Sequence, residues 1–372
     1  MPDNQLVVYW HPDVLKHDPG RGCYEYESSP LMEVDEPHPE TPERIINIRS
    51  ILQRGEISPL IDWRDGRHAE KDEIARFHDM AYINEVVNAE QSAPVRIDGS
   101  GTVVATGTVD AVFAAAGTTI EALNAVLAEN TAAYAMVRPP GHHAARNMAD
   151  GNCIFNNLGI AVETALANGC NKVAVIDWDV HHGNGTQSGF YDRDDVLTLS
   201  MHMPLGSWGE NHPETGEVNE IGAGAGKGFN FNIPLPYGSG DQAYARAMDE
   251  LVRPVISDYD PELIVIACGQ DANQFDPNGR NLLSMSGFRN LGTVARELAA
   301  ELCDGRLLLC QEGGYAITYT GFCMYAVAEG VLGISEPMKD PLAYDATIEE
   351  PDVPFAQITR VGEVWRKLVG QT

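Results

Sequence analysis

The chain has 372 residues, 44% of them apolar, and a formal net charge of −29. This apolar content supports a large core and excludes wholesale disorder. The acidic balance excludes a nucleic-acid binder, because such proteins need a basic face. We favour a solvated acidic surface, as in salt-adapted proteins, over attraction of cationic substrates as the reason for the charge.

The seven cysteines and the first residues bear on the location of the protein. The cysteines form no C-x-x-C pair, and their odd number disfavours a disulfide framework. The opening Met-Pro-Asp-Asn-Gln lacks the basic and apolar regions of a signal peptide. The longest apolar runs, such as that from Leu263 to Cys268, are too short to span a bilayer. We therefore expect reduced thiols, a cytoplasmic location and no membrane contact.

Helical and strand patterns alternate along the chain. Thr41 followed by Pro42 favours a helix start, with a capping side chain and a proline in the first turn. In chain order, the sequence then predicts a helix over 107–127, a strand over 134–137, a helix over 156–167, strands over 173–176 and 196–200, a helix over 243–258, a strand over 263–267, a helix over 288–303 and a strand over 307–310. This alternation predicts one α/β domain over 1–372 with a mainly parallel sheet. We expect the tail, 336–372, to pack on its surface.

Polar motifs follow four of the predicted strands. They are Pro-Pro-Gly-His-His at 139–143, Asp-Trp-Asp-Val-His-His-Gly-Asn-Gly at 177–185, Gly-Gln-Asp at 269–271 and Gln-Glu-Gly-Gly-Tyr at 311–315. In parallel sheets the ligand site lies beyond the carboxyl ends of the strands. The four motifs are therefore predicted to meet at one edge of the sheet.

A metal site is the simplest use of three of these residues. Asp179 and His181 are two residues apart, so on an extended chain their side chains point the same way. Asp271, from another strand end, can supply a second carboxylate. Two oxygens and one nitrogen suit zinc with one position left for water, although Mn(II) or Fe(II) would accept the same ligands. A merely structural hydrogen-bonded pair of Asp179 and His181 is disfavoured by the other polar strand ends.

The adjacent histidines His142 and His143 are candidates for proton transfer. They follow a rigid Pro-Pro-Gly turn, and imidazole acts as a base or an acid near neutral pH. Asp177 and Asn184 are polar residues of a neighbouring strand end that can set the histidine tautomers.

Tyr315 is a candidate for stabilising an oxyanion. It follows two glycines, Gly313 and Gly314, which let the backbone come close to a ligand. A phenol pointed at the metal could hydrogen-bond the oxyanion of a tetrahedral intermediate.

Together, these motifs resemble those of the histone deacetylase family. The segments are R-P-P-G-H-H-A at 138–144, D-W-D-V-H-H-G-N-G-T-Q at 177–187 and Q-E-G-G-Y at 311–315. The resemblance is closest to the class II branch and to the bacterial deacetylase-like amidohydrolases, and H-P-E-T-P-E-R at 38–44 resembles the N-terminal motif of that branch. The resemblance covers about 38–330. It implies an arginase/deacetylase-like α/β fold, with an eight-stranded mainly parallel sheet flanked by helices.

The resemblance also implies roles for individual residues. It implies zinc ligands at Asp179, His181 and Asp271, catalytic histidines at His142 and His143 with partners at Asp177 and Asn184, and an oxyanion-stabilising tyrosine at Tyr315. Of the two histidines, His143 is implied as the general base and acid. A structural potassium ion is implied at the side chains of Asp177 and Ser200 and the backbone carbonyls of Asp179, His181 and Met201.

The substrate channel departs most from the family pattern. The family lines its channel with two aromatic rings, but the corresponding residues are Asn152, in Gly151-Asn152-Cys153, and His212, before Pro213. Trp208 lies near enough in sequence to replace the second ring. We expect a more polar channel that favours a smaller or more polar amide than acetyl-lysine.

Two further positions concern the substrate. The resemblance places Asp98 as the rim acid that grips the substrate backbone. Asn278 stands seven residues after Asp271, where a polyamine-selective relative carries glutamate. A neutral side chain attracts no ammonium. We therefore expect no strong preference for acetylated polyamines, unless other acids near the mouth substitute.

The sequence thus predicts a zinc-dependent amidohydrolase that removes an acyl group, such as acetyl, from acetyl-lysine or a small N-acyl amine. The alternatives are a hydrolase of acetylpolyamines or other small amides and, more remotely, an inactive binding protein of the same fold. A homo-oligomer remains open.

Overall fold

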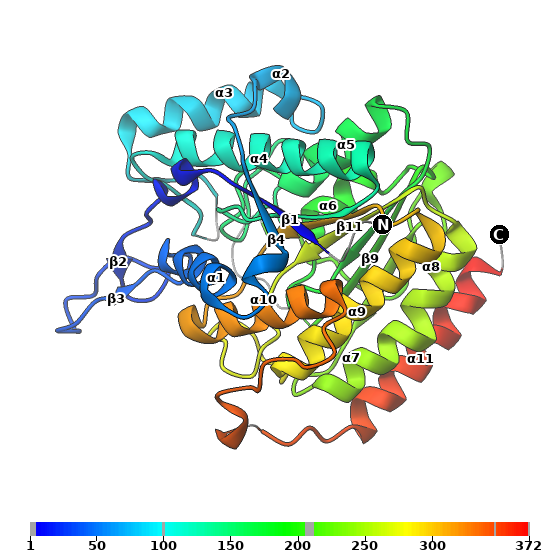
Figure 1. Cartoon of the computed structure of the whole chain (residues 1–372). Helices are drawn as coiled ribbons and strands as arrows, with labels where there is room; N and C mark the ends of the chain where they lie inside the picture. The colour runs from blue at the N-terminus through cyan, green and yellow to red at the C-terminus, as the bar shows by residue number, and fades with distance from the viewer. Residues whose placement is uncertain (1–4, 99–100, 205–211, 346, 371–372) are drawn as a thin grey trace.

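The computed structural model describes residues 5–98, 101–204, 212–345 and 347–370. At its centre lies one eight-stranded sheet in the order β10-β9-β8-β11-β12-β7-β1-β4, and every neighbouring pair is parallel (Figure 1). The strands are β1 (Leu6–Trp10), β4 (Ile61–Asp65), β7 (Ala132–Ala135), β8 (Val173–Asp177), β9 (Val196–His202), β10 (Asn230–Pro234), β11 (Leu263–Cys268) and β12 (Leu307–Gln311). The predicted fold class is confirmed.

Helices cover both faces of this sheet. They are α1 (Glu43–Arg54), α2 (Lys71–Ile74), α3 (Met80–Ala89), α4 (Thr108–Glu129), α5 (Asn157–Ala167), α6 (Asn184–Phe190), α7 (Asp241–Ala247), α8 (Arg253–Tyr259), α9 (Met285–Leu302), α10 (Ile317–Leu332) and α11 (Asp352–Val369). In Figure 1, α3, α4 and α5 lie on one side of the sheet, and α1, α7, α9 and α10 lie on the other. Strands buried on both faces read as continuous apolar runs, as β8 and β11 do.

Helix α4 is long and apolar enough to cross a membrane by length and composition alone. Most of it is buried inside the protein, where it packs against α5, β1 and β7. Its apolar composition is accounted for by this position in the core.

The structure refines several predicted elements. The helix predicted over 243–258 is α7 and α8, joined by a π-helical turn at Met248–Val252. The predicted capping by the Thr41 side chain is wrong: its hydroxyl donates to the carboxylate of Glu43 and accepts from no backbone N–H of α1. In the tail, α11 packs on the rest of the chain, with the Trp365 ring stacked on Phe231 of β10 at a centroid distance of 4.2 Å.

The strand order explains the position of the site. The four strands followed by polar motifs, β8, β11, β12 and β7, are consecutive neighbours in the middle of the sheet. All are parallel, so the four motifs emerge at the same edge.

Candidate active site

The predicted ligands Asp179, His181 and Asp271 lie together at this edge. Their ligating atoms all lie within 4.8 Å of one another, and all three residues are buried. Nδ1 of His181 is 3.0 Å from Oδ2 of Asp271 and 3.2 Å from Oδ1 of Asp179. The three side chains are therefore close enough together to bind one metal ion.

The charge of this cluster favours a cation. Buried carboxylates are costly unless they are paired or coordinate a metal. Burial and the charge of Asp179 raise the pKa of Asp271 to about 7. Two carboxylates and one imidazole are a donor set that a divalent metal ion such as zinc can accept.

Backbone groups orient these carboxylates. The N–H of Gly313 donates to Oδ2 of Asp179 at 2.8 Å, and the N–H of Val180 donates to Oδ1 of Asp271 at 2.8 Å. A Cβ atom at Gly313 would collide with the carboxylates of both Asp271 and Asp179. Gly313 is therefore required by the close approach of the β12 loop to the ligands.

His142 is paired with a carboxylate. Its Nδ1 lies 2.9 Å from Oδ2 of Asp177, the last residue of β8. Burial opposes protonation of His142, but the charges of Asp179 and Asp177 outweigh it and raise the pKa to about 10. His142 is therefore protonated beside the carboxylates of the cluster. A cation bound to these carboxylates would lower the pKa of His142 again.

His143 belongs to a different hydrogen-bond chain. Its Nδ1 lies 2.6 Å from Oδ1 of Asn184, whose Nδ2 donates to Oδ2 of Asp150 at 2.9 Å. A carboxylate only accepts, so Asn184 must present its carbonyl oxygen to His143, and Nδ1 of His143 carries the hydrogen. Burial, followed by the nearby charge of His142, lowers the pKa of His143 well below its usual value. In neutral His143 with its hydrogen on Nδ1, Nε2 is the basic nitrogen.

Tyr315 is held over the same site. Its backbone N–H donates to Oδ2 of Asp276 at 2.7 Å, and the Arg44 guanidinium stacks 4.8 Å from its ring centroid. Arg44 also donates to the carbonyls of Glu312 and Gly314, which fixes the loop. Burial raises the pKa of the Tyr315 hydroxyl, so it stays protonated and can donate a hydrogen bond.

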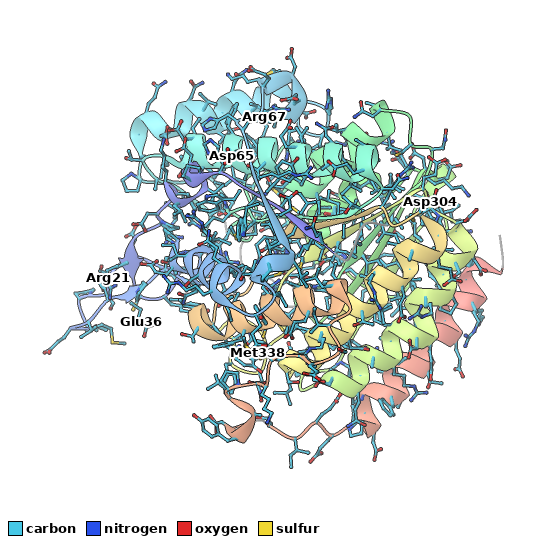
Figure 2. The ribbon with its side chains drawn as sticks, in the orientation of Figure 1. Arg21, Glu36, Asp65, Arg67, Asp304 and Met338 are labelled. Atoms are coloured by element: carbon cyan, nitrogen blue, oxygen red, sulfur yellow. The ribbon has the colours of Figure 1, made fainter. Side chains whose placement is uncertain are left out.

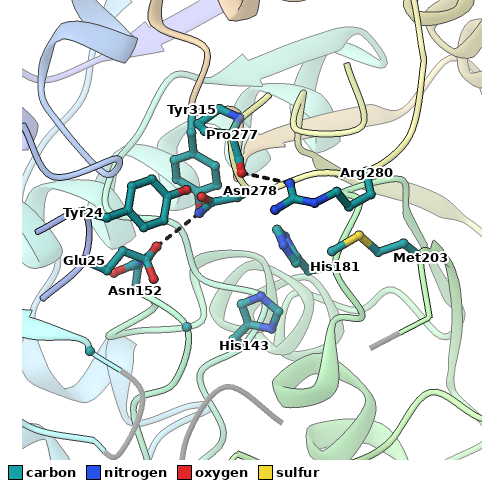
Figure 3. Close-up of a pocket in the computed structure, with 12 residues that line it drawn as sticks. Tyr24, Glu25, His143, Asn152, His181, Met203, Pro277, Asn278, Arg280 and Tyr315 are labelled. Carbon is teal, nitrogen blue, oxygen red and sulfur yellow. Dashed lines mark hydrogen bonds between the residues drawn. The ribbon is translucent and has the colours of Figure 1, made fainter. Parts of the chain in front are cut away.

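A cavity of about 240 Å³ leads to these groups (Figure 3). His143, His181 and Tyr315 line it together with Tyr24, Glu25, Gly101, Gly151, Asn152, Met203, Pro277, Asn278 and Arg280. Asn152 adopts a left-handed conformation with φ 66°, which asparagine tolerates better than most residues. No phenylalanine or tryptophan is among the described residues that line the cavity.

The other predicted substrate residues are placed differently. Asp98 is half-buried, and its Oδ1 accepts from the N–H groups of Gly101, which lines the cavity, and Thr102 at 2.7 and 2.8 Å. His212 is buried with its Nδ1 2.8 Å from Oδ2 of Asp150, and it is not among the described residues that line the cavity. The prediction for Trp208 lies outside the described residues.

Several residues of the site carried no prediction. Asp150 orients Asn184, and Asp276 and Arg44 hold Tyr315. Arg44 is the last residue of the motif at 38–44, but the sequence predicted no role for it. Glu25 lies outside every motif, and no pattern pointed to it.

Two cysteines near the motifs are poor nucleophiles. Cys153 and Cys268 are fully buried. Burial raises the pKa of both thiols, which keeps them protonated, and the thiolate is the reactive form.

Comparisons with known proteins find matches that cover most of the chain. Residues 38–331 match the histone deacetylase domain. Histone deacetylase 8 of Arabidopsis thaliana is 46% identical over 348 residues, which cover 92% of each chain. The histone deacetylase-like amidohydrolase of Pseudomonas aeruginosa is 38% identical over 325 residues, or 87% of this chain and 84% of that protein. The crystal structure of the HDA15 HD domain matches with a TM-score of 0.84 at 28% identity, covering 99% of this chain and 96% of that one.

Proposed function

This chain belongs to the histone deacetylase family, and from that premise we propose that it is a zinc-dependent hydrolase of linear N-acyl amines. The observation that carries the proposal is the buried cluster of Asp179, His181 and Asp271, beside a cavity that His143 and Tyr315 also line. Ligands, a base and an oxyanion donor thus share one site.

A metal ion at this site would activate the amide and the water. A zinc ion held by Asp179, His181 and Asp271 would act as a Lewis acid on the amide carbonyl and lower the pKa of the attacking water. The remaining steps belong to side chains of this chain.

His143 carries the proton between water and amine. Its Nε2 takes a proton from the attacking water, and the oxygen forms a bond to the amide carbon. The Tyr315 hydroxyl donates a hydrogen bond to the negative charge that develops on the carbonyl oxygen. Protonated His143 then donates to the nitrogen as the C–N bond breaks, which releases a carboxylic acid and a free amine. No residue becomes acylated.

A structural potassium ion is part of the proposal. Asp177 and Ser200 are partners in the β8–β9 ladder, and both are buried. With the carbonyls of Asp179, His181 and Met201 they supply the oxygen ligands that a hard cation prefers.

The polar wall of the cavity supports a small or polar N-acyl amine as substrate. Asn152, predicted to replace the ring that lines the channel of other family members, lines the cavity with its amide. A panel of acetyl-lysine peptides, acetylated polyamines and small acyl amides, compared by kcat/KM, tests this. Hydrolysis of none of them, by protein that contains zinc, would refute the proposed activity.

Tyr315→Phe should lower kcat by about 10²–10³ while zinc content stays unchanged. The loss corresponds to about 2.7–4 kcal/mol, as for other oxyanion donors. Steady-state kinetics with metal analysis would measure both. Tyr319→Phe is the control, because its hydroxyl bonds Asp340 at 2.6 Å and it does not line the cavity. A loss below threefold for Tyr315→Phe would mean that this hydroxyl does not bind the oxyanion.

A further inference from the structure

The cavity contains a carboxylate that the proposed mechanism does not use. Glu25 lines it together with the catalytic candidates His143 and Tyr315. Glu25 comes from the segment between β2 (Arg21–Gly22) and β3 (Glu36–Pro37), which lies at the edge of the molecule, where Figure 2 labels Arg21 and Glu36. An N-terminal segment thus completes a wall built otherwise by the sheet-edge loops.

The backbone around Glu25 is well fixed. Cys23 and Tyr26 exchange backbone hydrogen bonds of 3.0 and 3.2 Å across a tight turn, in which Tyr24 has φ 65°. Arg96 donates to the carbonyl of Glu25 at 2.8 Å, and its guanidinium lies 5.6 Å from the Tyr26 ring centroid. The position of Glu25 is therefore set before any ligand arrives.

Two amides orient the side chain of Glu25. Asn278 and Asn152 donate from Nδ2 to its Oε1 at 3.1 and 3.3 Å, and the first of these bonds is drawn in Figure 3. A carboxylate has about four acceptor positions, and these bonds use only those of one oxygen. No described residue donates to Oε2 of Glu25. A negative charge with free acceptor capacity thus remains at the cavity.

Two neighbouring acceptors also lack partners. The hydroxyl oxygen of Tyr24 and Oδ1 of Asn278 are buried without a hydrogen bond among the described residues. Both residues line the cavity, and Figure 3 shows them on the same side of it as Glu25. Buried polar atoms without partners cost free energy that a suitable ligand recovers. An ammonium group has three donors and no acceptor, so it can donate to the Glu25 carboxylate and to unpartnered oxygens beside it.

We propose that Glu25, with Tyr24 and Asn278, binds a second, non-reacting ammonium group of the substrate. The preferred substrates are then monoacylated diamines or polyamines. This inference rests on the proposed hydrolysis of N-acyl amines and names the substrate class. It replaces the expectation from the neutral Asn278, because Asn278 orients a carboxylate that the N-terminal segment supplies.

Arg280 brings a positive charge to the cavity that Glu25 lines. It is exposed and donates to the carbonyls of Pro277 and Gly279 at 2.9 and 2.6 Å. Its positive charge weakens the attraction of Glu25 for a cation. Removing it should increase the preference for a cationic substrate, whereas removing Glu25 should abolish that preference.

The test compares a monoacetylated alkane diamine with the N-acetylalkylamine of the same chain length, which lacks the second charge. We expect kcat/KM to favour the diamine derivative at least tenfold in the unmodified chain, and less at high salt. Glu25→Gln should bring this ratio close to one, and Arg280→Gln should raise it. Glu27→Gln is the matched control, because it removes an exposed charge from the same segment outside the cavity and should leave the ratio unchanged.

Three results would overturn the assignment. They are a ratio near one in the unmodified chain, a ratio retained in Glu25→Gln, and an equal loss in Glu27→Gln, which would indicate attraction by the overall charge of −29. Calorimetric binding of the monoacetylated diamine and of the neutral N-acetylalkylamine to Tyr315→Phe, which should turn them over slowly, supplies a second measurement. If neither amide is hydrolysed by the unmodified chain, the proposed function fails, and tighter binding of the diamine derivative that depends on Glu25 still supports the ammonium site. Equal binding of the two amides would refute it.

Discussion

Asp179→Ala or Asp271→Ala should abolish hydrolysis and lower the zinc content well below one ion per chain. Each change removes one of three buried ligands, and two protein ligands rarely suffice for a catalytic zinc site. Metal analysis of the purified variants, with kinetics on the best substrate of the panel, measures both effects. Full zinc occupancy and normal rates in both variants would refute the metal assignment.

Folding must be separated from metal loss in this experiment. Asp271→Asn serves this purpose, because its amide oxygen can still accept from the N–H of Val180, as the carboxylate does at 2.8 Å. We expect it to fold, as judged by circular dichroism, and to bind zinc poorly. Asp241→Asn is the control: its carboxylate accepts from the N–H of Ser284 at 2.9 Å, away from the ligands, and its zinc content and rate should stay near those of the unmodified chain.

His143→Ala should lower kcat by about 10²–10⁴, the usual range for loss of a general acid–base residue. His143 serves in both proton transfers, so the upper part of this range is expected. Zinc should be retained, since His143 is not among the three ligands. Kinetics and metal analysis of one preparation would show the loss of rate with full metal.

A matched histidine tests whether the loss is specific. His68→Ala removes an imidazole that lies 2.9 Å from the Asp13 carboxylate and does not line the cavity. Its rate should remain close to that of the unmodified chain. If His143→Ala kept more than a tenth of the rate with zinc bound, another group would have to be the base.

The central strands could be predicted because their apolar runs reflect burial on both faces. The edge strands β4 and β10 were not predicted, and β1 was missed too, although its sequence Leu-Val-Val-Tyr-Trp is a fully buried apolar run. β4 has the sequence Ile-Asp-Trp-Arg-Asp, which is only partly buried, and β10 contains two asparagines that bond to other side chains and loops. The strand conformation of β4 and β10 depends on contacts with residues distant in sequence, which no local pattern reveals.

The ligands and histidines could be predicted because each stands next to a strand end. Their spacing encodes their direction, as for Asp179 and His181. Asp150 could not be predicted, because its role depends on Asn184 and His212, which are distant in sequence. Glu25 reaches the cavity through a turn of an irregular segment, and only the folded chain brings it to Asn278.

Metal removal and return tests the central claim most directly. The purified chain is stripped with a chelator, dialysed and titrated with zinc, while acyl release is measured on the best substrate of the panel. Hydrolysis should fall to background on stripping and rise linearly until one zinc ion is bound per chain, because one cluster of buried ligands serves the reaction. Unchanged hydrolysis by the metal-free chain would contradict the proposed zinc-dependent hydrolase.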